Sequence, residues 1–449
     1  GNITYKRNSV DIRQADYVYW SAPVKAQTLG GVSPLTLSDK YLSWETTKWV
    51  ANPSTSFMTA GKGYIIRGPE TFSNTVRTPY TASFIGVPNN GTIAGETAVP
   101  STYYLIGNPY PSALSADDFI NANLFLVGTM YFWTHNTPVV LGPSYKYNSD
   151  DYATYNLSGG AGTQKAPSGG AAGTNINVPS GYIAAGQSFF MGAKAAGSIS
   201  FANSMRRAAN NNGQFFKPAG ASKTADLEKN RVWLDMTNEE GAFKQILVGY
   251  IEGATNDYED MYDGLTFDGN KYIDFYSINN ASKLVIQGRA LPFADTDAVP
   301  LGYRTAVEGN FTISLSDADG KLSTQAVYLE DKTTGTLSDL RAANYTFATA
   351  AGTFPDRFVL RYTNKTLGTG DFENTENGIL VSVKDKTVKV QSSKEAIQEV
   401  AVFDISGKLL LDKKKVGANE LQVSNLQAGN QVLLVNVTLE NGFKTSRKI

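Results

Sequence analysis

The chain has no cysteine and a single histidine among its 449 residues. Without thiols it can form neither a disulfide framework nor a thiolate metal site, and one imidazole is a poor basis for a zinc site. No apolar run approaches the roughly 20 residues that a membrane-spanning helix requires. No signal peptide is visible at Gly1, so we expect a processed protein or a fragment. The net charge of −1 provides no global field that would draw nucleic acid or anionic lipid.

Turn-forming and aromatic residues are abundant instead. Gly (42), Tyr (24) and Phe (22) are frequent, while charged residues make up 18% of the chain. Short apolar runs such as "GYIIRG", "GTMYFW" and "SISFAN" are separated by Gly, Pro and Asn, which is typical of sandwiches and barrels. The best helix candidate is "SALSADDFINAN" (residues 112–123), with Ser115 as its N-cap. The sequence therefore predicts an all-β protein of the β-sandwich type.

Two polar, small-residue-rich stretches divide the chain into three expected domains. The stretches are "KPAGASKTADLEKN" (217–230) and "NKTLGTGDFENTEN" (364–377). They delimit a Gly- and Tyr-rich β domain at 1–218, a β-sandwich at 229–364 and a terminal module at 377–449. Three domains agree with the length of the chain, since a domain typically has roughly 150 residues. A low-complexity loop, "SGGAGTQKAPSGGAAGT", is too poor in apolar residues to supply a core.

The terminal module contains seven short apolar runs, close to the strand count of an immunoglobulin-like sandwich. In "NQVLLVNVTLENG", alternate residues from Leu433 to Leu439 fall on one face, and Val432 and Leu434 make the other face partly apolar. "ENG" predicts a hairpin turn, and "DISGK" a second turn with Gly407 in a left-handed conformation. From residue 378 onward, 11 Lys and Arg face 7 Asp and Glu, which gives +4. The remaining chain is at −5.

"VAVFDISGKLLL", "LQVSNLQAGNQVLLVNVTLENG" and "KTSRKI" resemble the C-terminal sorting domains of the type IX secretion system of Bacteroidota. Upstream segments such as "GKGYIIRGP", "LIGNPYPSA" and "LVGYIEGATNDY" resemble regions that precede this domain in flavobacterial surface proteins. The commoner type A pattern opens its penultimate strand with Gly-x-Tyr, whereas Gly429, Asn430 and Gln431 stand here. More narrowly, the segments resemble the type C form of gliding flavobacteria. Because of the departure from the type A pattern, the resemblance does not imply the type A consequences of cleavage and lipopolysaccharide attachment.

This resemblance implies export across the outer membrane and an extracellular or cell-surface location. The module would be read as a folded signal by the type IX translocon and its shuttle barrel protein. An exposed last strand can be gripped as a rigid body or by strand addition at its edge. The expected recognition residues are Asn441, Gly442, Lys444, Arg447, Lys448 and Ile449. On the residues alone, the favoured interpretation of these cations is the solvated face of a strand that discourages aggregation, and it is the resemblance that favours recognition.

Catalytic signals are weak. His135 in "YFWTHNTP" has no Gly-x-Ser-x-Gly nucleophile elbow beside it, and we interpret it as a structural histidine that hydrogen-bonds a loop. No phosphate-cradling loop before a helix and no basic–aromatic stripe for nucleic acid occurs. We therefore predict that the protein is not an enzyme.

Acidic residues cluster in "NDYEDMYDG" (256–264). Calcium takes six to eight oxygen ligands and favours such loops outside the cell. The candidate calcium ligands are Asp257, Glu259, Asp260 and Asp263. "SDADG" (316–320) offers Asp317 and Asp319, although Asp-x-Asp-Gly is also a common turn. No other cofactor is indicated, and nothing fixes the separation that a glycosidase carboxylate pair requires.

Aromatic residues are the remaining resource for binding. Tryptophans 20, 44, 49 and 133 and nearby tyrosines could stack on sugar rings if exposed together, but core packing is the ordinary role of such side chains. We therefore expect a secreted or surface cargo protein, adhesin-like or part of the gliding apparatus. The alternatives are an extracellular polysaccharide-binding or -degrading module, and a structural stalk.

Overall fold

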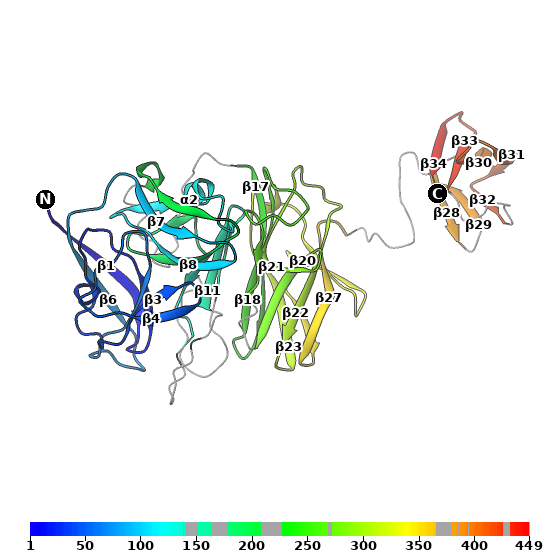
Figure 1. Cartoon of the computed structure of the whole chain (residues 1–449). Coiled ribbons are helices and arrows are strands. Elements are labelled where there is room, and N and C mark those ends of the chain that lie inside the picture. Colours follow the sequence, from blue (N-terminus) through cyan, green and yellow to red (C-terminus); the bar gives the residue numbers. More distant parts are fainter. Residues whose placement is uncertain are drawn as a thin grey trace. The chain divides into compact units, whose positions relative to one another are not determined.

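The computed structural model divides into two compact units, Gly1–Asn364 and Lys365–Ile449 (Figure 1). Strands dominate both units, so the predicted all-β fold is confirmed. The described residues are 1–137, 139, 147, 151–163, 178–207, 227–267, 272–364, 379–384, 387–393, 395–424 and 432–448.

The first part of the first unit is built from short strands in several small sheets. Its strands are β1 (Ile3–Ile12), β2 (Tyr17–Trp20), β3 (Tyr41–Glu45), β4 (Lys48–Ala51), β5 (Tyr64–Arg67), β6 (Thr78–Gly86), β7 (Ile93–Ala98), β8 (Thr102–Gly107), β9 (Ala113–Ser115), β10 (Met130–Trp133), β11 (Tyr152–Asn156), β12 (Gly159–Ala161), β13 (Tyr182–Ile183), β14 (Ser188–Ala193), β15 (Gly197–Phe201) and β16 (Arg206–Arg207). The two largest sheets have the orders β12-β11-β10-β14-β8 and β2-β5-β3-β4. Alternate side chains of β10 and β14 enter different apolar clusters on the two faces of the five-stranded sheet.

Helices are few and short in the described residues. They are α1 (Leu29–Val32), α2 (Ala116–Ala122), and the 3-10 helices η2 (Asn203–Met205) and η4 (Gly320–Ser323). Helix α2 begins where the sequence predicts, because the Ser115 hydroxyl accepts a hydrogen bond from the backbone N–H of Asp118 and so satisfies a donor of the first turn.

The second part of the first unit forms one large sheet. Its strands are β17 (Lys229–Asn238), β18 (Phe243–Ile251), β19 (Gly264–Leu265), β20 (Ile273–Asn279), β21 (Ser282–Arg289), β22 (Ala298–Thr305), β23 (Gly309–Asp319), β24 (Tyr328–Asp331), β25 (Thr336–Asp339), β26 (Tyr345–Thr349) and β27 (Gly352–Arg361). The order is β25-β24-β27-β22-β20-β21-β18-β17-β23-β26, and β19 pairs with β21. One apolar core takes side chains from β24 near one end of this order, from β26 at the other end and from the strands between them. The sheet therefore folds over a common core, as in a sandwich.

The expected boundary at 218–229 separates two sets of sheets within one compact unit. Ala161 of β12 packs against Trp233, Leu247 and Ile286 of the large sheet, and all four are buried. The Trp233 indole N–H also donates to the carbonyl of Gly160. These apolar contacts bind the two sets of sheets together.

The second unit is a small sandwich of two antiparallel sheets. Its seven described strands are β28 (Ile379–Lys384), β29 (Thr387–Ser392), β30 (Ile397–Asp404), β31 (Leu409–Ala418), β32 (Glu420–Val423), β33 (Leu433–Leu439) and β34 (Lys444–Lys448). One sheet has the order β28-β29-β32 and the other β31-β30-β33-β34. Val388 and Val390 from the first sheet share a core with Val400, Val402 and other residues of the second. The seven-stranded C-terminal sandwich is thus present as predicted.

Candidate functional site

Strand β34 forms one edge of the four-stranded sheet, since among the described strands it pairs only with β33. Lys448 lies opposite Leu434, and Lys444 lies opposite Thr438. Directly opposed residues in a sheet project from the same face. Both lysine side chains therefore extend from the solvent face of the sheet, where they are exposed and form no ion pair with a described residue.

Arg447 is the exception among the predicted recognition residues, because it lies opposite the buried Val435 and is half-buried. Its Nη1 donates to the hydroxyl of Thr445 at 2.8 Å. Its Nε and Nη2 are shielded and have no acceptor among the described residues. Arg447 is thus not on the same face as the two lysines. The sixth predicted residue, Ile449, lies outside the described residues.

The turn between β33 and β34 holds the other two predicted residues. Gly442 has a φ of 83° and donates its N–H to the carbonyl of Leu439, and Asn441 Oδ1 accepts the N–H of Phe443. Among the described residues of this turn only Gly442 has a positive φ. The hairpin forms as predicted, but it is not a type I′ turn, which needs positive φ at both central residues.

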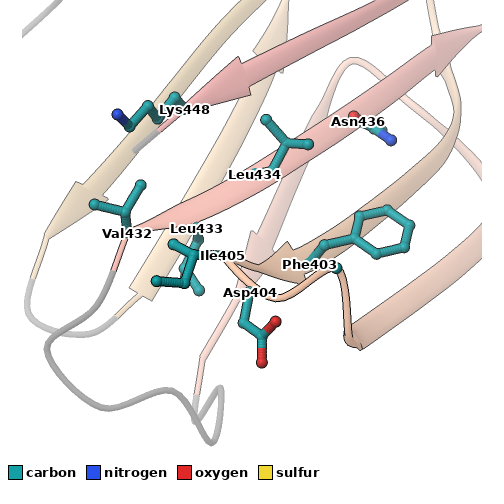
Figure 2. A pocket seen from close by; sticks show the side chains of 9 residues that line it. Phe403, Asp404, Ile405, Val432, Leu433, Leu434, Asn436 and Lys448 are labelled. Carbon is teal, nitrogen blue, oxygen red and sulfur yellow. The ribbon is translucent and has the colours of Figure 1, made fainter.

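A groove of about 490 Å³ lies on the solvent face of the four-stranded sheet (Figure 2). We call it the outer-face groove, and its lining residues are Phe403, Asp404, Ile405, Gly407, Val432, Leu433, Leu434, Asn436 and Lys448. Three of its apolar side chains are well exposed: Ile405 (79%), Val432 (40%) and Leu434 (42%). An apolar groove with a lysine in its wall is suited to a partner that has both apolar and acidic groups.

Strand alternation explains the groove. Leu433, Val435 and Val437 of β33 point into the core, which leaves Leu434 and Asn436 on the solvent face. Phe403 of β30 lies opposite Leu434 and therefore projects from the same face. The apolar Val432 and Leu434 already indicated in the sequence that this solvent face is partly apolar. The contribution of Phe403 and Ile405 depends on strand pairing, which no local sequence pattern specifies.

The "DISGK" turn closes one end of the groove. Gly407 adopts the predicted positive φ, at 82°. Asp404 Oδ1 accepts hydrogen bonds from the hydroxyl and the N–H of Ser406 and from the N–H of Lys408. The Ser406 hydroxyl, followed by the Lys408 N–H, lowers the pKa of Asp404 below its ordinary value. The turn therefore keeps a carboxylate in the wall of the groove.

The acidic cluster of the first unit forms an internally bonded loop. Asp263 Oδ2 accepts the N–H of Glu259 and its Oδ1 the N–H of Gly288, while Glu259 accepts the N–H of Thr255. Burial raises the pKa of Asp263 to about 6. Asp260 pairs with Lys194 at 3.4 Å.

Asp257 donates its N–H to the Thr255 hydroxyl. In the described part of the chain, no group of three or more His, Asp or Glu side chains is arranged to hold a metal ion. Calcium at the four predicted ligands stays a prediction.

His135 is buried, and its Nδ1 accepts the indole N–H of Trp133 at 2.9 Å. Burial, and then the positive charges of Arg77 and Arg13, lower its pKa to about 3. Nearby Asp151 is also buried and accepts the N–H and the hydroxyl of Thr137, and burial raises its pKa to about 7. Both groups are thus buried and hydrogen-bonded to neighbouring residues, and the structural role of His135 stays a prediction.

The four tryptophans of the first part do not form an exposed platform. Trp20 and Trp133 are buried, whereas Trp44 and Trp49 are half-buried on the β3–β4 hairpin, with ring centroids 5.2 Å apart. They pack with Tyr19 and Phe190 in one aromatic cluster. Core packing accounts for most of these side chains.

Two family models match the chain. The first is described as a domain of unknown function (DUF8693) and matches residues 1–362. The chain belongs to the DUF8693 family. The DUF8693 match runs through residues 218–229 without a break, in agreement with the compact first unit.

A second model, also described as a domain of unknown function (DUF8694), matches residues 367–449. The gap between the DUF8693 and DUF8694 matches falls where the two compact units divide. No curated protein matches the chain. None of the helices in its described part is long and apolar enough to span a membrane.

Proposed function

We propose that the protein is a cargo of the type IX secretion system and that its second unit is the folded export signal. The observation that supports this best is the combination, on one small sandwich, of the β34 edge, the outer-face groove and two lysines that form no ion pair with a described residue. The resemblance of its strands to type C sorting domains points to the same role. The second unit has its own core and its own family match, as suits an export signal that can be joined to the C-terminal end of different cargo domains.

Recognition would combine two elements. The backbone of β34 offers unpaired groups along one edge, which a strand of the translocon or of its shuttle barrel protein can extend. Lys444 and Lys448 beside this edge would attract acidic groups of the partner, while Leu434 and Ile405 supply apolar contact. The cargo would then be displayed on the cell surface or released from it.

The first unit would act outside the cell as an adhesin or as part of the gliding apparatus, without an enzymatic reaction. The two large apolar cores between its sheets suit a mechanically robust surface protein. The alternative is an extracellular polysaccharide-binding or -degrading module. One observation favours this alternative: two carboxylates line the same pocket on the large sheet.

The proposal is tested with the full chain in a gliding flavobacterium. Lys444→Glu with Lys448→Glu reverses the charge beside the β34 edge. The matched control is Lys413→Glu with Lys415→Glu, which makes the same charge change on exposed residues of β31, the other edge strand of that sheet. Cell-surface and medium fractions should lose the first variant and keep the second. Equal export of both would contradict a recognition role for these lysines.

A further inference from the structure

A second pocket lies on the face of the large sheet that is turned away from its main core. Its volume is about 260 Å³. The polar residues that line it are Asp235, Gln245, Ser316 and Asp317, and Trp233, Phe243 and Val178 form its apolar wall. This pocket belongs to the first unit and is independent of the proposed export signal.

Three neighbouring strands bring the polar residues together. Leu234 and Met236 of β17 point into the main core, so Asp235 projects from the opposite face. Across β17 and β18 it lies directly opposite Gln245. Across β17 and β23, Trp233 lies opposite Asp317.

An irregularity in β23 supplies the fourth polar group. Trp233 pairs with Asp317 and the next residue, Leu234, pairs with Leu315, so Ser316 is an extra residue on β23. In a regular strand, Ser316 and Asp317 would project from opposite faces. The bulge instead lets both line the pocket. Bulges of this kind re-aim side chains and are frequent beside functional sites.

Hydrogen bonds fix the floor of the pocket. Gln245 Nε2 donates to Asp235 Oδ1 at 2.7 Å, and Gln245 Oε1 accepts the N–H of Gly162 at 2.8 Å. The indole of Trp233 is held by Gly160 and is 7% exposed. The pocket is therefore organised before any ligand enters, which lowers the entropic cost of binding.

Two carboxylates line the pocket, and none of its described lining residues is a Lys or an Arg that could balance their charge. The closest guanidinium on β17, that of Arg231, is 4.9 Å from the Trp233 ring centroid and is paired with Asp319. Burial raises the pKa of Asp235, although hydrogen bonds from Gln245 and Ser316 oppose the shift. Asp235 is half-buried and Asp317 is exposed at the mouth of the pocket, so a cation next to the half-buried carboxylate is favoured.

We propose that this pocket binds a primary ammonium group on a compact body. The ammonium would lie between Asp235 and Asp317 and donate to both carboxylates and to the Ser316 hydroxyl. The body would pack against Trp233 and Phe243. A water occupies about 30 Å³ of liquid, so the cavity has room for roughly nine groups of that size. That size suits one amino-sugar ring or one lysine side chain.

A neutral sugar would leave both carboxylates without a counter-charge, so it fits less well than an amino sugar. A metal ion fits less well too, since the described residues offer no group of three or more acidic or histidine ligands. The ammonium is thus the chemistry that both the charge and the apolar wall favour.

Calorimetric titration of the full chain tests this proposal with four probes. D-glucosamine and Nα-acetyl-lysine amide carry the ammonium, while D-glucose and N-acetylglucosamine are neutral. The ammonium probes should bind at least about tenfold more tightly than the neutral ones, because each would pair with the half-buried carboxylate of Asp235 as well as with Asp317. Preference for glucosamine would identify an amino sugar as the ligand, and preference for the lysine derivative would identify a protein side chain.

Variants place the binding at the pocket. Asp235→Asn and Asp317→Asn should each weaken ammonium binding at least about tenfold. The control, Asp295→Asn, makes the same charge change at an exposed loop residue outside the pocket and should bind as the unchanged protein does. Unaltered thermal melting would show that the variants are folded.

Three results would overturn the proposal: equal affinity for glucose and glucosamine, wild-type affinity in both pocket variants, or no binding of either ammonium probe. Calcium binding that depends on Asp235 and Asp317, without ammonium binding, would overturn it as well. None of these results bears on export.

Discussion

Lys448 and Leu434 are direct cross-strand neighbours at the open edge of the second unit, and both project from the solvent face. The pair combines an exposed apolar side chain with an ammonium group that forms no ion pair with a described residue. Leu434 is 42% exposed although its neighbour Val435 is fully buried. A large apolar side chain in this position contributes little to stability and is available for contact with a partner.

Leu434→Asn should therefore separate export from stability. We expect the free energy of unfolding of the second unit to change by no more than about 0.5 kcal/mol, as for most surface substitutions. Export to the cell surface should fall, because the groove loses apolar contact area. Chemical denaturation and fractionation of cells measure the two effects.

The matched control for this variant is Leu409→Asn. Leu409 is 49% exposed and does not line the outer-face groove. It should leave export unchanged. Loss of export in both variants would show that any polar substitution on this sheet is harmful, and would remove the groove from the account.

Leu439→Ala is expected to destabilise the second unit by about 2–5 kcal/mol, the usual cost of deleting a buried leucine side chain. Leu439 is 2% exposed and belongs to the core of the small sandwich. Because the two units have separate cores, denaturation of the full chain should show an early transition for the second unit and an unchanged later one. A single transition that shifts as a whole would contradict independent folding.

His135→Gln should alter how stability depends on pH. The folded-state pKa of His135 is lowered from 6.5 to about 3, so below pH 6.5 the unfolded chain binds a proton that the folded one does not. Stability is then lost as pH falls, by about 1.4 kcal/mol per unit. The variant should lack this loss. The difference in the free energy of unfolding between the variant and the unchanged protein should therefore change by about 2 kcal/mol between pH 6.5 and pH 5.

Asp151 has the opposite effect, and it explains why the comparison must be between two proteins. Its pKa is raised to about 7 by burial, so its folded form gains stability as pH falls through that value. This contribution is common to His135→Gln and the unchanged chain. Denaturation of both at several pH values isolates the histidine; parallel curves would contradict its buried, neutral state.

Local sequence signals predicted local structure well. Ser115 caps α2, Gly407 and Gly442 have positive φ, and the apolar alternation around Leu433 gives a half-buried strand. The cap and the two turns each depend on a single residue, and the strand depends on the alternation of apolar and polar residues; both kinds of signal can be seen directly in the sequence.

Features that depend on pairing between distant segments could not be predicted. Ala161 and Trp233 belong to one apolar cluster, although the polar stretch at 217–230 predicted that they lie in separate domains. The inward position of Arg447 follows from its register with Val435. The pocket beside Asp235 needs the extra residue Ser316 in β23. The segment "SDADG" stood out in the sequence, but the bulge at Ser316 depends on how β23 pairs with β17.

The measurement that tests the central claim most directly is export of a carrier by the second unit. Residues 365–449 are fused to a periplasmic fluorescent protein in a gliding flavobacterium, and a second fusion ends at residue 439, so that it lacks the last turn and β34. We predict that the complete unit takes the carrier to the surface or the medium and that the shortened one leaves it in the periplasm. Retention of both carriers, while the full chain is exported from the same cells, would contradict the proposal that this unit is the export signal.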